Sequence, residues 1–347
     1  MTRALRGSGV GLACALSVLG AATPAEALQE PEDPPFTMSP GARVQVRYTG
    51  TEPEGPEDGT NTFRVQRARL SLSGEAYERF SYGIQADLSG SGGTLLDAYI
   101  RLAATDALTV WFGQGKAYFG RQWLNSSANL QFVDRTIVHS RFNADRQQGV
   151  ALLGRAAENR VEVNLGLYNG EGIGRSVNSD NRFMTVGRIV FTPWGSYSPV
   201  ESAHDYPEDP RLAIGVAGLR NTTGGEEEEE VQITRFNTEI AFKLRGFSAT
   251  AEVFGEWVDP VGGVEETASG WYVQGGILFP GLHHEVAARV AGVQPDAPNA
   301  DRTELGLAYS YYIRAHNAKI QADIRNIHED GTDLDTRELR VQFQLAL

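Results

Sequence analysis

The sequence has little of what several common classes of protein require. Its single cysteine, Cys14, excludes an internal disulfide and a cysteine-ligated metal site. After the first 27 residues, no stretch approaches the ~18 apolar residues of a membrane-spanning helix, which excludes a helical membrane protein. The 31 lysines and arginines are outnumbered by 44 acidic residues, for a net charge of -13. A nucleic-acid-binding protein is therefore disfavoured, because phosphate contacts need a basic surface.

The N-terminal residues have the composition of a cleaved targeting segment. A basic start precedes a short apolar core over 10–19, and Ala25-Glu26-Ala27 matches an A-x-A cleavage site. We therefore expect residues 1–27 to be a signal peptide and the exported chain to begin near Leu28. The alternative is a lipoprotein signal at Cys14, but the residues before this cysteine match a lipobox poorly.

The rest of the chain is dominated by alternation of apolar and polar residues with a period of two. In its last segment, apolar residues at every odd position from Leu339 to Leu347 alternate with glutamate, arginine, glutamine and alanine. No segment shows a comparable helical period. Sixteen segments of this kind are predicted as strands, near 42–50, 62–74, 79–89, 95–104, 107–116, 147–156, 160–169, 182–192, 211–220, 231–245, 247–258, 269–279, 283–293, 302–314, 317–327 and 336–347.

An even number of strands, each near the ~9–11 residues that cross a bilayer, is typical of a bacterial outer-membrane barrel. The links after even strands are mostly tight and those after odd strands longer, except that the even link 193–210 is also long. We predict an all-β fold, a 16-stranded antiparallel transmembrane β-barrel over 41–347, preceded by a short periplasmic segment over 28–40. A secreted β-sandwich is the alternative, although it rarely needs sixteen similar strands in one domain.

Several segments of the chain resemble a known family. Phe63–Gly74 (FRVQRARLSLSG), Val110–Gly120 (VWFGQGKAYFG) and Gly166–Gly172 (GLYNGEG) are similar, in this order, to the phosphate-selective porin O and P family. The resemblance implies a barrel of outer-membrane porin type, a homotrimer, an inward-folded third outer loop and an arginine- and lysine-lined path for phosphate-like anions. The chain differs in ending on Leu347 instead of an aromatic residue and in having only three lysines.

The location of the charges changes the meaning of the net charge. An arginine on the lipid face at mid-membrane costs about 2–4 kcal/mol, so the strand face that carries Arg340 must line the lumen. Six links hold 22 acidic residues and no lysine or arginine. Without these links and residues 1–40, the chain carries 29 basic and 18 acidic residues. We therefore expect acidic links around a basic barrel.

The longest link, 117–146, is the candidate constriction loop, because it combines arginines with aromatic residues able to anchor it to the barrel wall. The candidate pore and anion-binding residues in and beside this link are Lys116, Arg121, Arg135, Arg141 and Arg146. The candidates on the predicted strands are Arg101 and the pair Arg67 and Arg69, which share one face of the strand 62–74 with Ser71 and Ser73. The alternative for each is an ion pair with a facing carboxylate, such as Asp87, Asp97, Glu162, Glu252 or Glu285.

These features predict a passive outer-membrane diffusion channel for small hydrophilic solutes with a preference for anions. Phosphate or polyphosphate is the solute that the resemblance implies. The expected partners are outer-membrane lipids and lipopolysaccharide, with no cofactor, metal or nucleic acid. The alternatives are a general or cation-preferring porin and a non-conducting structural or adhesion barrel. No enzymatic activity is expected, because no serine lies near a histidine in a recognisable lipase motif.

Overall fold

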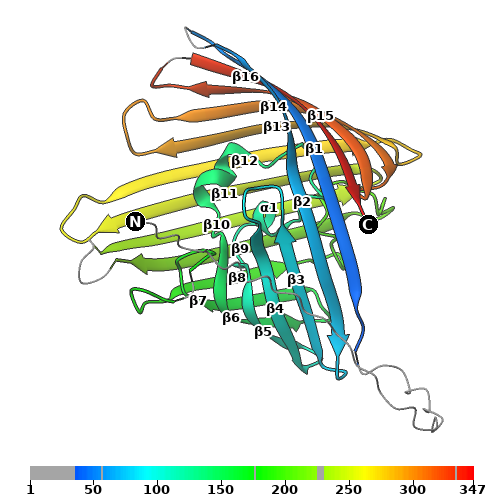
Figure 1. Cartoon of the computed structure of the whole chain (residues 1–347), viewed down its shortest axis with the longest axis vertical. Helices are drawn as coiled ribbons and strands as arrows, with labels where there is room; N and C mark the ends of the chain where they lie inside the picture. Colours follow the sequence, from blue (N-terminus) through cyan, green and yellow to red (C-terminus); the bar gives the residue numbers. More distant parts are fainter. Residues whose placement is uncertain (1–35, 56–57, 176, 225–229, 333) are drawn as a thin grey trace, which may run out of the picture. The chain divides into compact units, whose positions relative to one another are not determined.

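Sixteen antiparallel strands form a closed barrel in the computed structural model, which describes residues 36–55, 58–175, 177–224, 230–332 and 334–347 (Figure 1). Each strand pairs with its neighbours in sequence, and β1 pairs with β16 to close the barrel. The strands are β1 (Ser39–Pro53), β2 (Thr60–Ala76), β3 (Phe80–Asp87), β4 (Thr94–Thr105), β5 (Leu108–Lys116), β6 (Arg146–Ala156), β7 (Val161–Tyr168), β8 (Met184–Phe191), β9 (Arg211–Thr223), β10 (Val231–Leu244), β11 (Phe247–Pro260), β12 (Glu266–Leu278), β13 (His284–Pro295), β14 (Arg302–Arg314), β15 (Ala318–Glu329) and β16 (Leu334–Ala346).

The predicted fold is confirmed. All sixteen predicted strands are present, and their ends differ from the predicted ones by three residues at most. The predicted signal peptide, 1–27, lies outside the described residues, as does most of the segment 28–40. Both therefore stay predictions.

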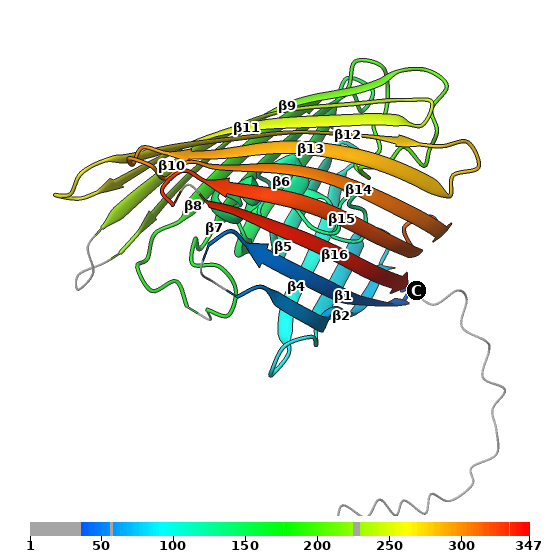
Figure 2. The same ribbon diagram turned by 90° about the horizontal axis from the view of Figure 1, so that it is seen from above.

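The alternation in sequence becomes an apolar outer surface and a polar interior. On β16, Val341 and Phe343 are 38% and 46% exposed, whereas Arg340 and Gln342 beside them are 3% and 1% exposed. Because charge on a lipid-facing surface is costly, the outer surface faces lipid and the inner surface faces the lumen. Figure 2 shows β1 and β2 beside β16, so the first and last strands share one wall.

The two ends of the barrel differ in how they connect the strands. Most links at the end where β1 begins and β16 ends, called the terminal end, are tight. Between β10 and β11 the chain turns through Arg245 and Gly246, whose φ angles of 47° and 85° suit a two-residue hairpin turn. Longer links join the strands at the opposite end, called the loop end.

Two links fold into the barrel from opposite ends. The 117–145 link leaves β5 at the loop end and contains the short helices α1 (Arg121–Leu124) and α2 (Ile137–Phe142) (Figure 1). The 192–210 link leaves β8 at the terminal end, and its Ser202 donates a hydrogen bond to Glu285 on the inner wall. This inward course explains why the 193–210 link is long where its neighbours are tight. No helix in the described residues is long and apolar enough to cross a membrane.

Candidate functional site

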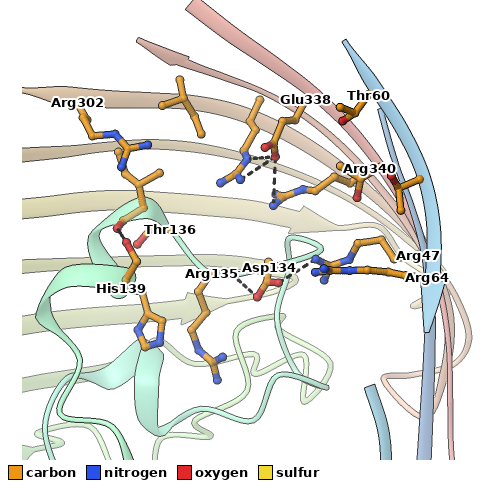
Figure 3. A pocket seen from close by; sticks show the side chains of 16 residues that line it. Arg47, Thr60, Arg64, Asp134, Arg135, Thr136, His139, Arg302, Glu338 and Arg340 are labelled. Atoms are coloured by element: carbon orange, nitrogen blue, oxygen red, sulfur yellow. Dashed lines mark hydrogen bonds and ion pairs between the residues drawn. The ribbon is translucent and has the colours of Figure 1, made fainter. Parts of the chain in front are cut away.

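The 117–145 link lines one side of two cavities inside the barrel. The outer cavity, of about 600 Å³, lies toward the loop end, where Thr60 and Arg302 begin their strands (Figure 3). The inner cavity, of about 270 Å³, lies toward the terminal end and is lined by Arg69, Arg101 and Trp111 among others. A solute crossing the barrel beside this link would meet the lining of both cavities.

A row of arginines on β1 and β2 runs from one cavity to the other. Arg47 and Arg64 face each other across the two strands, line the outer cavity and reach from the wall toward Asp134 (Figure 3). Closer to the terminal end, Arg43 is paired in register with Arg69, which lines the inner cavity. Arg67 lies between these two levels. The arginine row therefore consists of Arg43, Arg47, Arg64, Arg67 and Arg69.

Four basic residues of the arginine row and the inner cavity have carboxylate partners, as do Arg302, Arg325 and Arg340 of the outer cavity. In the arginine row, Asp87 pairs with Arg69 at 2.7 Å, and a single carboxylate, Asp134, serves both Arg47 at 3.0 Å and Arg67 at 3.4 Å. The positive charges of Arg67 and Arg47 hold the pKa of Asp134 below its ordinary value although burial alone would raise it. The fourth pair joins Arg146 to Asp97 at 2.8 Å. These four cations are matched by only three carboxylates.

Lys116 and Arg135 bind carbonyl oxygens instead of carboxylates. Lys116 Nζ donates to the carbonyl oxygens of residues 123–125 at 2.6 to 3.3 Å. Arg135 donates to the carbonyl oxygens of Gln122 at 3.0 Å and Asn125 at 2.8 Å. Burial lowers the pKa of Arg135 to about 10, so its guanidinium stays charged at neutral pH. Arg135 therefore adds positive charge that no carboxylate of the described chain neutralises by direct contact.

Three further arginines beside the cavities form no ion pair with a described carboxylate within 4.0 Å. Arg101 lies over the ring of Tyr99, 4.5 Å from its centroid, and lines the inner cavity. Arg43 donates to the hydroxyl groups of Ser126 and Ser127 at 3.1 and 3.2 Å. Arg64 lines the outer cavity. The surroundings of both cavities thus carry an excess of positive charge.

Carboxylates on β11, β14 and β15 hold the backbone of the 117–145 link. Three of them, each from a different strand and at most 2% exposed, accept hydrogen bonds from its N–H groups. The pairs are Arg121 and Gln122 N–H to Glu252 (2.7 Å each), Val133 N–H to Asp323 (2.9 Å) and Ile137 N–H to Glu304 (2.8 Å). These three carboxylates are buried under the link and line neither cavity, so the charged side chains that face the cavities are mostly arginines.

Two of the predicted pore residues lie away from both cavities. Arg121 is 3.4 Å from Glu239, and its guanidinium lies over the ring of Tyr197 at 4.6 Å. Arg141 is 2.9 Å from Glu256 on β11. Both point to the strand carboxylates on which the link docks, called the acidic wall, which are Glu239, Glu252, Glu256, Glu304 and Asp323. Of the eight predicted residues, the structure therefore brings six to the cavities or the row between them, namely Lys116, Arg135, Arg146, Arg67, Arg69 and Arg101.

Three members of the arginine row, Arg43, Arg47 and Arg64, were not among the residues predicted from the sequence. A signal was available for two of them, because Arg43 and Arg47 share the inward parity of β1 with Gln45 between them. The outward positions of the same strand, Val44 and Val46, are apolar. Reading each arginine by its parity on the strand would have found these residues.

The 192–210 link supports the 117–145 link from the terminal end. Glu201 accepts hydrogen bonds from the backbone N–H of Gln131 at 2.8 Å and from the side-chain amide of Gln274 on β12 at 2.9 Å. Its own backbone N–H donates to the carbonyl of Asn129 at 3.3 Å. Glu201 therefore joins the two inward links to the barrel wall.

Replacing Glu201 by alanine should loosen this junction. Gln131, which is 3% exposed, would lose the acceptor of its N–H, and an unsatisfied buried donor costs about 1–3 kcal/mol. We expect more open-channel current noise in single-channel recordings and a matching loss of unfolding free energy. Glu208→Ala, at an exposed position of the same link, is the control. Equal noise in the two variants would contradict the role of Glu201.

The histidines at the terminal end pack against neighbouring aromatic rings. Among the described residues, no group of three or more histidine, cysteine, aspartate and glutamate side chains could hold a metal ion. His204 packs edge-on against Tyr312, with 4.3 Å between ring centroids, and against His316 at 5.1 Å. Burial lowers the pKa of His204 to about 4, so this imidazole is neutral at neutral pH. The rings help to seat the 192–210 link.

Comparisons with known proteins point to one family. The model of the phosphate-selective porin O and P family matches residues 40–345. No curated protein matches the chain. Similar solved structures are an anion-selective porin from Comamonas acidovorans (TM-score 0.69, 9% identity, 90% of this chain and 100% of that one), the outer membrane channel DcaP of Acinetobacter baumannii (0.67, 10%, 90% and 97%) and a loop L8 deletion mutant of OmpT, an outer membrane protein of Vibrio cholerae (0.62, 12%, 90% and 100%).

The identities to these structures are so low that the likeness shows the fold alone. The family match is independent of them and covers nearly the whole barrel. Family and fold together are those of an outer-membrane channel and not of an enzyme. The resemblance noted in the sequence is thereby confirmed. The chain belongs to the phosphate-selective porin O and P family and is an outer-membrane porin.

Proposed function

We propose that this porin is a passive diffusion channel that prefers small anions. The observation that carries the proposal is the excess of positive charge along the 117–145 link and the arginine row, where Arg64, Arg101 and Arg135 have no carboxylate partner among the described residues. Charges act strongly in a narrow passage with low-dielectric walls, so these residues would concentrate anions and repel cations. The similar porin from Comamonas acidovorans is described as anion-selective, which supports the same reading.

Phosphate or polyphosphate is the solute that we propose on the basis of the family. Arginine suits this role, because its planar guanidinium can donate two parallel hydrogen bonds to phosphate oxygens. Lysine contributes less, since Lys243 and Lys319 are fully buried and only Lys116 lies beside a cavity. Phosphate recognition in this chain would therefore rest on the arginine row and on Arg101 and Arg135.

The assembly that we propose is a homotrimer in contact with outer-membrane lipids and lipopolysaccharide, formed after removal of residues 1–27. An OmpT structure from Vibrio cholerae, similar at a TM-score of 0.55 and 11% identity, is described as a trimer form. The apolar outer surface of the barrel is the surface that would meet lipid and neighbouring copies.

Reversal potentials in planar bilayers under a potassium chloride gradient test the anion preference directly. We expect the sign of an anion-preferring channel, because potassium ions would meet the uncompensated cations of both cavities. The opposite sign would support the cation-preferring alternative. A protein that inserts without conducting would support the structural or adhesion barrel.

A further inference from the structure

The two cavities differ in the chemistry of their lining. The described lining of the outer cavity is mainly arginine, threonine and isoleucine, without phenylalanine, tyrosine or tryptophan. The inner cavity is lined by three aromatic side chains, Tyr99, Trp111 and Tyr118. An aromatic surface does not bind a hydrated inorganic anion, because the faces of aromatic rings offer no strong hydrogen bonds. The lining of the inner cavity therefore suits a ligand that has an apolar part as well as a negative charge.

Two glycines let aromatic rings lie against the strand backbone. A Cβ at Gly83 on β3 would be 2.6 Å from the ring of Tyr99, and a Cβ at Gly115 on β5 would be 3.0 Å from the ring of Trp111. The centroids of these two rings are 6.0 Å apart, so Trp111 backs Tyr99. The wall of the inner cavity is thus a supported aromatic surface that a flat apolar group can stack on.

The same cavity is strongly basic. Its described lining holds four basic side chains, Arg69, Arg101, Lys116 and Arg146, and one carboxylate, Asp97. Arg101 lies over Tyr99, and its buried Nε has no hydrogen-bond partner among the described residues. A donor held beside an aromatic ring fits a ligand that carries an anionic group next to a flat ring.

We propose that the inner cavity is a binding subsite for aromatic carboxylates. The proposal rests on the anion preference proposed above and names a class of solute that the preference favours. The ring would pack against the rings of Tyr99 and Tyr118, and the carboxylate would accept hydrogen bonds from Arg101. The volume of about 270 Å³ lies just below the range of about 300–1,000 Å³ typical of ligand pockets, so a single-ring acid fits best.

Block of the chloride current through the full-length channel by benzoate tests this proposal. Cyclohexanecarboxylate is the matched probe, since it has the same charge and a similar size but no flat aromatic ring, and acetate gives the effect of charge alone. We expect half-block by benzoate at a concentration about fivefold lower than by cyclohexanecarboxylate, which is the size of effect measured for aromatic pairs. In Tyr99→Leu/Tyr118→Leu this ratio should fall to about one.

Two further variants separate stacking from general disturbance. Tyr99→Phe keeps the ring and should keep the ratio. Tyr197→Leu removes another inward tyrosine, which lies under Arg121 at 4.6 Å but outside the inner cavity, and should leave the ratio unchanged. If Tyr99→Leu/Tyr118→Leu forms no channel, the single variant Tyr118→Leu is measured instead. In this variant the ratio of the half-blocking concentrations of cyclohexanecarboxylate and benzoate should fall by about half.

The results distinguish this subsite from the anion preference. Equal block by benzoate and cyclohexanecarboxylate, with an anion-preferring reversal potential, would overturn the subsite and leave the proposed function standing. A ratio that survives in Tyr99→Leu/Tyr118→Leu would also overturn it. A cation-preferring reversal potential of the unmodified channel would overturn the proposed function and, with it, the subsite.

Discussion

Replacing Arg64, Arg101 and Arg135 together by glutamine is expected to abolish the anion preference of the channel. Each residue lines a cavity and lacks a carboxylate partner among the described residues, so each removal takes away a full positive charge. A charge at contact distance is worth about 1 kcal/mol even in bulk water, or about fivefold in relative ion occupancy. We expect the anion-to-cation permeability ratio from reversal potentials to fall by at least about tenfold.

The matched control removes two arginines from the acidic wall. In Arg121→Gln/Arg141→Gln, Glu239 keeps its pair with Arg188 at 2.6 Å, and Glu256 likewise keeps its pair with a second arginine. The carboxylates therefore stay compensated, and the permeability ratio should stay close to that of the unmodified channel. If the control loses selectivity to the same extent as Arg64→Gln/Arg101→Gln/Arg135→Gln, the ions do not pass through the two cavities beside the arginine row.

The control also marks the limit of what the sequence could predict. Alternation reports which face of a strand a residue occupies, and it therefore identified Arg67 and Arg69 as lumen residues. Links have no such period, so the composition of 117–146 indicated an inward loop but not the direction of its side chains. Arg121 and Arg141 lie on the acidic wall because the link docks on Glu252 and Glu304, carboxylates more than a hundred positions away in sequence.

The 193–210 link is a second segment whose packing the sequence did not predict. Its length contradicted the rule that links at the terminal end are tight, and nothing in its composition indicated where the extra residues go. The structure shows that Glu201 and Ser202 hold it against the 117–145 link and the wall. Contacts of this kind depend on the closed barrel, because only closure brings β8, β12 and β13 around one lumen.

Replacing Glu304 by alanine is expected to be the most destabilising single change. Glu304 pairs with Arg289, both side chains being fully buried, and it also accepts the N–H of Ile137 at 2.8 Å. Removing one partner of a buried ion pair costs about 3–5 kcal/mol, because the other charge stays buried without compensation. Within the described part of the chain, Arg289 would keep its contact with the Phe132 ring and its hydrogen bond to the carbonyl oxygen of Asp134. Denaturant unfolding of the protein in detergent or vesicles measures this loss.

An exposed ion pair between β14, which carries Glu304, and its neighbour β15 provides the control. Glu329 on β15 pairs with Arg302 on β14 at 2.8 Å, but the side chains are 45% and 44% exposed. Exposed pairs contribute about 0–1 kcal/mol, so Glu329→Ala should change the unfolding free energy little. Glu304→Gln keeps an acceptor for the N–H of Ile137, so its unfolding free energy should lie between those of Glu304→Ala and Glu329→Ala. A Glu304→Ala variant as stable as Glu329→Ala would mean that the wall carboxylates do not hold the link, and the separation of acidic and basic walls would lose its structural cause.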